Sequence, residues 1–300
     1  MTAARYHAAL SERARTLAIR MGYHSRPSFL IIGAQKAGTT ALHGYLAEHP
    51  AILPAQDKEL GFFSPEIFSD WPEHPNHAIL CTREGTVFDH PRSYRQATTW
   101  YHGRFPWPHE LGRNRLTFEA TPEYLYYPRV PRRIFEYDPA MKLIILLRDP
   151  VARAFSAWNM YRNFGGYRPF VYAPRRETRD FPTAIREEMK AIESGVAPRD
   201  PGYVRRGLYH EQLERYLQLF DRRQILVLHA LDLERRTGNV LERVAEFLEI
   251  EGWASKGQWQ RILIGEYESP IDEASRRLLR EFYAPHNREL YGVLQHDFGW

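Results

Sequence analysis

The sequence predicts an α/β fold in which a mostly parallel sheet is covered by helices on both faces. Short apolar runs with the length of buried strands recur along the chain, segments with helical spacing separate them, and no internal repeat interrupts the alternation. The strands are expected at Phe29–Ile32, Leu116–Phe118, Lys142–Leu147 and Gln224–His229. Ligands of such sheets bind at the carboxyl ends of the strands.

Helices are expected where apolar residues recur three and four positions apart. Their predicted ranges are Arg129–Tyr137, Val151–Arg162, Pro182–Ser194, Gly207–Phe220, Asn239–Glu249 and Ile271–Tyr283. Residues 64–113 are rich in Pro, His and Trp, and residues 165–206 are rich in Arg, Pro and Gly. We expect these two segments to be irregular insertions on the sheet rather than domains.

A further helix is expected over residues 3–21. Its apolar face is formed by Tyr6, Leu10, Ala14, Leu17 and Met21. The simpler interpretation docks this face on the protein's own domain, and a homodimer or partner contact is the alternative. Because Arg26-Pro27 breaks the pattern, the predicted division is a helix and lead-in over residues 1–27 and one domain over residues 28–300.

Composition narrows the functional classes. The 300 residues are 43% hydrophobic and 26% charged, which suits a globular domain with a full core. A net charge of +4 suits an anionic ligand and is too small to indicate nucleic acid. The single cysteine, Cys81, excludes an intramolecular disulfide and a cysteine-rich zinc site. Because neither a signal-peptide pattern nor a long apolar run is present, we expect a cytoplasmic protein without a membrane span.

The most informative stretch is FLIIGAQKAGTTALHGYL, residues 29–46. Its order of strand, glycine-containing loop and helix gathers backbone N–H groups and a helix N-terminus around one point, which attracts an anion. Gly33 and Gly38 allow a tight turn, Lys36 adds an ammonium group, and two threonines add hydroxyl donors. The alternative is an ordinary turn between a strand and a helix.

This loop departs from the ATP-binding pattern G-x-x-x-x-G-K-[ST], because Thr39 stands where the lysine is required. In ATP sites that lysine reaches the β and γ phosphates. The nearest acidic residue at a strand end, Asp149, lies between Arg148 and Pro150 and is a poor magnesium ligand candidate. We therefore expect a nucleotide without a γ-phosphate, handled without a metal.

A second anion site is expected in KLIILLRDPVARAFSAWNMYRN, residues 142–163. Arg148 ends a predicted strand, Pro150 opens a helix, and Ser156 lies two helical turns further on. Arg148 and Ser156 are therefore candidates to converge on a phosphate, with the guanidinium as a fork of donors. The alternative is a salt bridge between Arg148 and Asp149, with Ser156 as a small buried residue.

FLIIGAQKAGTTAL and LIILLRDPVARAFSAW together resemble the two nucleotide motifs of the sulfotransferase family, whose members use 3′-phosphoadenosine 5′-phosphosulfate (PAPS). The resemblance implies a P-loop NTPase-like three-layer fold with a central, mostly parallel sheet. It also implies that the first motif holds the 5′-phosphosulfate, where Lys36 stabilises the leaving phosphate, and that Arg148 and Ser156 hold the 3′-phosphate. The implied nucleotide-binding residues are Gly33, Gln35, Lys36, Ala37, Gly38, Thr39, Thr40, Ala41, Arg148 and Ser156.

Four further stretches resemble heparan sulfate 3-O-sulfotransferases and the sulfotransferase part of N-deacetylase/N-sulfotransferases. They are DKELGFFS from residue 57, WYHGRFP from residue 100, FEATPEYL from residue 118, and the ending APHNRELYGVLQHDFGW, so that the resemblance covers residues 28–300. In that family the glutamate of the KExxFF pattern is the base, which implies this role for Glu59. Many small-molecule sulfotransferases use a histidine instead, and His43 or His102 is the alternative here.

Two departures from the 3-O-sulfotransferase pattern concern the acceptor. Gly61 stands where those enzymes have a histidine, and Ala120 stands where they have a lysine. Since both family residues lie by the acceptor, the departures weaken heparan sulfate as the expected acceptor. We expect a carbohydrate or glycoconjugate first and a small metabolite second. The candidate acceptor-binding residues are Trp100, Tyr101 and His102, and Arg153 and Tyr209 are further candidates for the cleft.

The expected protein is thus a bacterial, cytoplasmic, PAPS-dependent O-sulfotransferase that needs no metal. Glu59 is expected to take the acceptor proton and Lys36 to stabilise the departing phosphate. A P-loop nucleotide kinase using ATP and magnesium is one alternative, against which Thr39 argues. A nucleotide-binding protein without catalysis is the other, and the joint presence of Lys36, Glu59, Arg148 and Ser156 argues against it.

Overall fold

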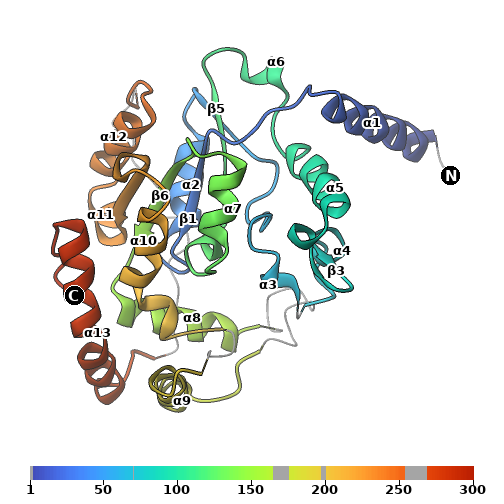
Figure 1. Ribbon diagram of the computed structural model, residues 1–300. Coiled ribbons are helices and arrows are strands. Elements are labelled where there is room, and N and C mark those ends of the chain that lie inside the picture. Colours follow the sequence, from blue (N-terminus) through green and yellow to red (C-terminus); the bar gives the residue numbers. More distant parts are fainter. Residues whose placement is uncertain (1–2, 70, 165–175, 197–200, 254–268) are drawn as a thin grey trace.

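A computed structural model describes residues 3–69, 71–164, 176–196, 201–253 and 269–300 of the chain (Figure 1). Five parallel strands form the central sheet in the order β2-β5-β1-β6-β7. Their bounds are β1 (Phe29–Gly33), β2 (Ile52–Pro54), β5 (Leu116–Ala120), β6 (Lys142–Leu147) and β7 (Ile225–His229). A separate antiparallel pair joins β3 (Cys81–Thr82) to β4 (Gly85–Thr86).

Helices flank the sheet (Figure 1). In chain order they are α1 (Ala3–Arg20), α2 (Thr39–Ala47), α3 (Glu66–Ser69), α4 (His77–Leu80), α5 (Pro91–His102), α6 (Pro108–Leu111), α7 (Val130–Tyr137), α8 (Pro150–Arg162), α9 (Phe181–Glu193), α10 (Tyr209–Leu217), α11 (Ala230–Arg235), α12 (Thr237–Leu248) and α13 (Glu273–Leu294). Short 3-10 turns lie at η1 (Val87–Asp89), η2 (Pro122–Leu125), η4 (Arg205–Gly207) and η5 (Arg222–Gln224). Among the described residues, none of the helices has both the length and the apolar character needed to cross a bilayer.

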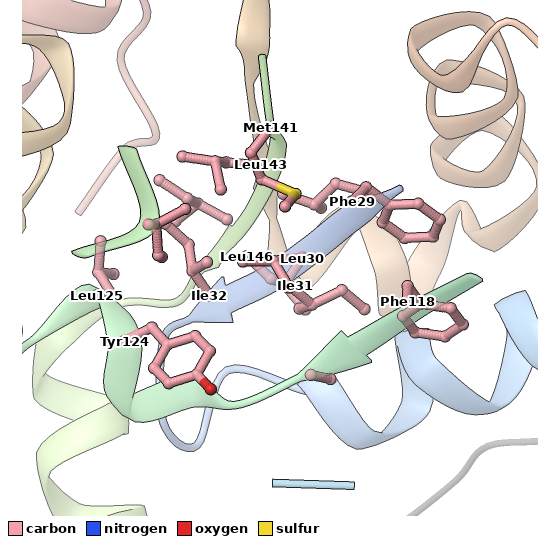
Figure 2. Close-up of a cluster of buried hydrophobic side chains, with 14 of the residues drawn as sticks. Phe29, Leu30, Ile31, Ile32, Phe118, Tyr124, Leu125, Met141, Leu143 and Leu146 are labelled. Atoms are coloured by element: carbon pink, nitrogen blue, oxygen red, sulfur yellow. The ribbon is translucent and has the colours of Figure 1, made fainter. Parts of the chain in front are cut away.

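The middle of the sheet is buried on both faces. Every residue of β1 is buried, which explains why this strand is a continuous apolar run rather than an alternating one. Phe29 of β1 pairs in register with Phe118 of β5, and their rings stack with centroids 4.8 Å apart (Figure 2). Across the other edge of β1, Leu30 pairs with Leu143 of β6. This packing fixes the strand ends from which the loops of the site emerge.

A second cluster of buried side chains lies beside the sheet and joins α8, α9 and α13. Phe155 and Phe181 pack edge to face within it, with centroids 5.1 Å apart. The hydroxyl of Tyr283 on α13 donates a 2.7 Å hydrogen bond to the carbonyl of Val204. The C-terminal helix is thereby attached to the segment that leads into α10.

The four predicted strands are present, with β6 at its predicted bounds and the others shifted by one or two residues. The prediction missed β2, which has only three residues and so little apolar length to detect. It was also wrong to treat residues 64–113 as irregular, because α5 occupies twelve of them. The predicted last helix ended at Tyr283, whereas α13 continues through Pro285 to Leu294.

The N-terminal helix is docked, but not by the face that the spacing predicted. Ile19 is buried, while Leu17 and Met21 are 59% and 79% exposed. Arg15 reaches across to donate to the carbonyl of Phe105, 2.8 Å away. The described part of α1 thus contacts its own domain near α5 (Figure 1). Tyr6 and Leu10 lie outside the described side chains.

Candidate active site

One large cleft of about 1960 Å³ lies where the five parallel strands end. The segment after each strand contributes lining residues, represented by Lys36, Glu59, Glu123, Arg148 and Ala230. The carboxyl end of a parallel sheet is the expected place for a ligand. The volume exceeds the ~300–1,000 Å³ of an ordinary small-molecule pocket, so there is room for two substrates together.

The loop after β1 has the order of strand, loop and helix that the sequence predicted. After β1 the chain turns through residues 34–38 into α2, with Gly38 as the N-cap at φ +95°. That left-handed conformation favours glycine. The first turn of α2 lines the cleft, so its unpaired amides and the positive end of the helix dipole lie there. This turn contains no acidic residue that would neutralise the dipole. Gln35, Lys36, Ala37, Gly38, Thr39, Thr40 and Ala41 all line the cleft, and Gly33 ends the strand behind them.

Lys36 has φ +67°, which is uncommon for a residue with a side chain. Its carbonyl accepts a 3.0 Å hydrogen bond from Nη1 of Arg148 at the end of β6. A left-handed backbone costs about 1–3 kcal/mol and persists only where its surroundings hold it. The Arg148 contact is such a constraint, and it links the two predicted anion motifs directly.

The second motif begins at the end of β6. Asp149 caps α8 by accepting from the amide of Val151 at 3.0 Å, so its carboxylate is engaged at the helix start. Arg148 and Ser156 both line the cleft. The hydroxyl of Tyr209 donates to the carbonyl of Arg148 at 2.9 Å and steadies this strand end from behind. The structure therefore brings Lys36, Arg148 and Ser156 into one cavity.

Glu59 also lines the cleft, in the segment that follows β2. It also has a positive φ, +65°, and its amide donates to the carbonyl of Ala120 at 3.0 Å. Its carboxylate pairs with the ammonium of Lys58 and is 53% exposed toward the cleft. Nearby, the amide of Gly61 donates to the hydroxyl of Thr121 at 3.2 Å. The stretches DKELGFFS and FEATPEYL are thus held against each other.

Comparison of the sequence and the fold with known proteins identifies the family of this chain. The sulfotransferase domain family matches residues 26–264. The chain belongs to the sulfotransferase family. A sulfotransferase from Alicyclobacillus acidocaldarius has a solved structure that is similar with a TM-score of 0.64 and 27% identity, covering 91% of this chain and 98% of that one. The fold is accordingly the P-loop NTPase-like fold of sulfotransferases.

Two human relatives are similar at the level of sequence. Human bifunctional heparan sulfate N-deacetylase/N-sulfotransferase 3 is 28% identical over 302 residues, covering 91% of this chain and 30% of the relative. Human heparan sulfate glucosamine 3-O-sulfotransferase 3A1 is 28% identical over 309 residues, covering 95% and 65%. The chain therefore spans about a third of the first relative and just under two thirds of the second.

A carboxylate that sequence analysis missed faces the cleft of this sulfotransferase beside Glu59. Glu123 accepts a 2.9 Å hydrogen bond from Nε2 of Gln35, and its Oε1 lies 3.9 Å from Nη1 of Arg206. Burial raises the pKa of Glu123, the charge of Glu59 raises it further, and Arg206 and Gln35 oppose the rise. Its place in FEATPEYL gave no sign of this, because only the fold brings it to Gln35.

Two of the three predicted acceptor residues are corrected by the structure. Trp100 does line the cleft of this sulfotransferase, but Tyr101 is fully buried and donates its hydroxyl to Glu119 at 2.9 Å. His102 is buried against Tyr137, with Nε2 2.8 Å from the phenol oxygen. Successive residues of α5 point in different directions, and here Trp100 points to the cleft while Tyr101 and His102 point into the core. Tyr101 and His102 support the wall from behind.

The buried Glu119 explains why Tyr101 is oriented inward. Its carboxylate accepts hydroxyl hydrogen bonds from Tyr101, Thr121 and Tyr124 at 2.9, 2.7 and 2.7 Å. Burial raises the pKa of Glu119, against the three hydroxyl donors, which favour its charged form. A buried carboxylate requires such partners. The cluster fixes the end of β5, from which Glu123 reaches the cleft.

The two histidines considered as alternative bases, His43 and His102, differ from Glu59 in their position relative to the cleft. Burial, and then His24 and Arg26, lower the pKa of His102 to about 3. Burial and the charge of Lys58 lower the pKa of His43 to about 4, and its ring packs 5.0 Å from that of Phe118. Neither residue is among those that line the cleft.

The further cleft candidates Arg153 and Tyr209 are also corrected. Arg153 is fully buried and donates to the carbonyl of Tyr203, and Tyr209 is buried with its hydroxyl bonded to the Arg148 carbonyl. Burial raises the pKa of Tyr209 to about 12, so its hydroxyl keeps the proton that it donates. Both residues belong to helices that adjoin the site, α8 and α10, but their side chains are buried in the core.

Proposed function

We propose that this sulfotransferase moves the sulfonyl group of PAPS to an acceptor hydroxyl. The observation that carries the proposal is the meeting of two candidate anion-binding motifs in one cleft, where Arg148 is bonded to the Lys36 carbonyl and Ser156 is a further lining residue. The open first turn of α2 fits a 5′-phosphate, and Arg148 fits a 3′-phosphate as a fork of donors. A mouse sulfotransferase solved with PAP shares this fold, with a TM-score of 0.51 at 12% identity.

In this proposal each side chain has a separate task. PAPS supplies a sulfonyl group bonded to a phosphate oxygen, and that bond breaks as the acceptor oxygen bonds to sulfur. Lys36 places an ammonium group where negative charge grows on the leaving phosphate. Glu59 accepts the proton that the acceptor hydroxyl loses, and its ion pair with Lys58 positions the carboxylate. The nucleotide loop and Glu59 line the same cavity, as in-line transfer requires.

The acceptor is proposed to be a carbohydrate or glycoconjugate, with a small metabolite as the second candidate. The human relatives are named as heparan sulfate enzymes. Beyond Glu59 the cleft is lined by rings, among them Trp71 and Trp100, which suit stacking on a sugar. Arg104 lies over the Trp100 ring at 5.2 Å and 3.6 Å from Asp57, so this cation already has a carboxylate nearby. That arrangement favours a less acidic acceptor than heparan sulfate.

Calorimetry tests the donor class, with 3′,5′-adenosine bisphosphate as ligand and ATP with magnesium as comparison. We expect the bisphosphate to bind tightly and ATP not to bind. A preference for ATP would reject the proposal in favour of a nucleotide kinase. An inert nucleotide-binding protein would bind the bisphosphate but transfer no sulfonyl group to any acceptor in a screen with PAPS.

The base is tested by Glu59→Gln and the leaving-group residue by Lys36→Ala. Both substitutions should abolish transfer, but Glu59→Gln should leave binding of the bisphosphate nearly intact, because the base contacts the acceptor. The exposed Glu84 offers a matched control, and Glu84→Gln should leave both properties unchanged. Full activity of the Glu59→Gln enzyme would remove this residue from the mechanism.

Domain division, cellular location and assembly are proposed on narrower grounds. We propose one catalytic domain over residues 28–300, preceded by a helix and lead-in over residues 1–27. The lone Cys81 supports a cytoplasmic setting without disulfides, and the similarity to a sulfotransferase from Alicyclobacillus acidocaldarius supports a bacterial origin. Exposed Leu17 on α1 and Met21 just after it support a homodimer contact, which light scattering of the wild type and of Leu17→Glu tests.

A further inference from the structure

Three side chains that the proposed mechanism does not use meet between α10 and α13. They are His210 on α10 and His286 and Glu289 on α13. Because His286 and Glu289 are three positions apart, they lie on the same face of their helix. Figure 1 shows α10 beside α13, and the two helices are in contact. None of the three residues lines the nucleotide cleft.

The donor atoms are close enough to share one ion. The ligand atoms of all three side chains lie within 4.8 Å of one another, and His210 Nε2 is 2.8 Å from Glu289 Oε2. A tetrahedral zinc ion with bonds of about 2.0–2.1 Å separates its ligand atoms by roughly 3.4 Å. The observed distances bracket that value, so small side-chain rotations suffice.

We propose that His210, His286 and Glu289 form a binding site for one divalent transition-metal ion, for which zinc is the best fit. Two imidazoles and one carboxylate are a common zinc ligand set, and a water completes the tetrahedron. Magnesium and calcium prefer a shell of oxygen ligands, which this cluster lacks. Cys81, the chain's one thiol, is not part of the cluster.

The burial of the three ligands suits this role. Glu289 is 62% exposed, so the cluster is open to solvent on one side for entry of the ion and for a bound water. His210 is buried, and its Nε2 is the ring atom that lies beside Glu289. An ion bound to this Nε2 leaves the ring proton on Nδ1, which fixes one tautomer of the imidazole.

The proposed site joins the C-terminal helix α13 to α10, the helix whose Tyr209 contacts the strand end at Arg148. His210 follows Tyr209, whose hydroxyl bonds to the carbonyl of Arg148. On the other side of the site, α13 carries Tyr283, which bonds to Val204. An ion that binds only the folded chain stabilises it by mass action. The bound ion is therefore expected to stabilise the fold, and the proposal does not depend on the sulfotransferase reaction.

Titration of chelator-treated, dialysed full-length protein with zinc chloride tests the site by calorimetry, and thermal unfolding gives a second readout. We expect one ion per chain and a higher Tm with zinc than with chelator. His286→Ala and Glu289→Gln, at less buried positions than His210, should each weaken zinc binding at least tenfold and reduce the Tm gain. Glu281→Gln, on an exposed position of α13, and His109→Ala, on an exposed histidine, should bind zinc like the wild type.

Cobalt provides an independent check, because tetrahedral Co²⁺ bound in place of zinc absorbs strongly in the visible range. That absorption should appear with the wild type and disappear with His286→Ala. Absence of saturable zinc binding to the wild type would overturn the proposal. Equal affinity of the wild type and both ligand variants would also overturn it, since the ion would then be bound elsewhere.

Discussion

The guanidinium of Arg148 donates a 3.0 Å hydrogen bond to the carbonyl of Lys36, so the two nucleotide motifs hold each other in place. Arg148 lies at the end of β6, and Lys36 lies in the loop after the adjacent strand β1. The pairing of β1 with β6 sets the separation of these two groups. The proposed 3′-phosphate site at Arg148 and the shape of the loop around Lys36 are therefore coupled.

The first prediction concerns this coupling. Arg148→Ala removes a charged donor from the 3′-phosphate, and charged hydrogen bonds contribute about 1.5–3 kcal/mol. Binding of 3′,5′-adenosine bisphosphate should therefore weaken roughly 10–150-fold. Adenosine 5′-phosphate should weaken only a few fold, through the loosened Lys36 carbonyl. Calorimetry with both ligands measures the difference.

Arg104→Ala is the matched control, since Arg104 lines the same cleft over Trp100. It should leave both nucleotide affinities unchanged. Equal losses for the two ligands in Arg148→Ala would reject the assignment of Arg148 to the 3′-phosphate.

The second prediction concerns Glu123. Glu123→Leu leaves Nε2 of Gln35 without its acceptor, whereas Glu123→Gln keeps an oxygen in nearly the same place. Leaving a buried donor unsatisfied costs about 1–3 kcal/mol. We therefore expect kcat/KM for PAPS to fall roughly tenfold in Glu123→Leu, an effect of about 1.4 kcal/mol, and to stay near the wild-type value in Glu123→Gln. Steady-state kinetics with the donor varied would show this, and equal kinetics for the two variants would exclude a positioning role.

Sequence patterns predicted the parts of this site that depend on local order along the chain. The strand, loop and helix around Lys36 and the strand end at Arg148 are contiguous segments, so apolar runs and glycine positions were enough. Glu123 is different, because its significance arises only when β5 lies beside β1 and brings it to Gln35. Tyr101 was misplaced for a similar reason, since its partner Glu119 is distant in sequence.

The metal cluster shows the same limit more strongly. His210 and His286 are 76 residues apart, and no ligand spacing along the chain marks them as a pair. Only the contact between α10 and α13 brings them together. The departures at Gly61 and Ala120 were visible in the sequence, but their physical cause was not.

The third prediction follows from the structure around Gly61. This residue has φ +68°, and a Cβ added to it would lie 2.6 Å from a ring carbon of Phe68. A histidine at this position would therefore have to displace Phe68. Gly61→Ala should lower the free energy of unfolding by about 1–3 kcal/mol, through backbone strain and overpacking. Urea denaturation at neutral pH measures the loss.

Gly292→Ala provides the opposite control. Gly292 lies within α13, and a Cβ there would meet no atom within 4 Å. Because alanine favours a helix interior over glycine, this substitution should stabilise the protein by about 0.5–1 kcal/mol. Loss of stability of the same size in both variants would contradict the explanation for Gly61.

The fourth prediction concerns the effect of pH on stability through Glu177, a buried residue whose carboxyl pKa lies far below its usual value. Burial opposes ionisation, but hydrogen bonds from Arg179 and Tyr203 lower the pKa of Glu177 to about 2. A carboxylate with a depressed folded-state pKa adds stability above its unfolded pKa of about 4.3, and this contribution is lost as pH falls toward 2. Glu177→Gln should therefore cost about 1.5–3 kcal/mol at pH 7 and progressively less below pH ~4.

Glu187→Gln is the control that separates the contribution of the buried Glu177 carboxylate from that of any carboxylate paired with Arg179. Glu187 also bonds to Arg179, at 2.6 Å, but it is 57% exposed, and exposed ion pairs contribute about 0–1 kcal/mol. Urea denaturation of both variants and the wild type across the acid range gives the comparison. The Glu187→Gln loss should be small throughout, while the Glu177→Gln loss should shrink as the pH falls. A Glu177→Gln loss that is independent of pH would mean that the carboxylate is not held in its charged form, because only a difference in proton binding between folded and unfolded states makes stability depend on pH.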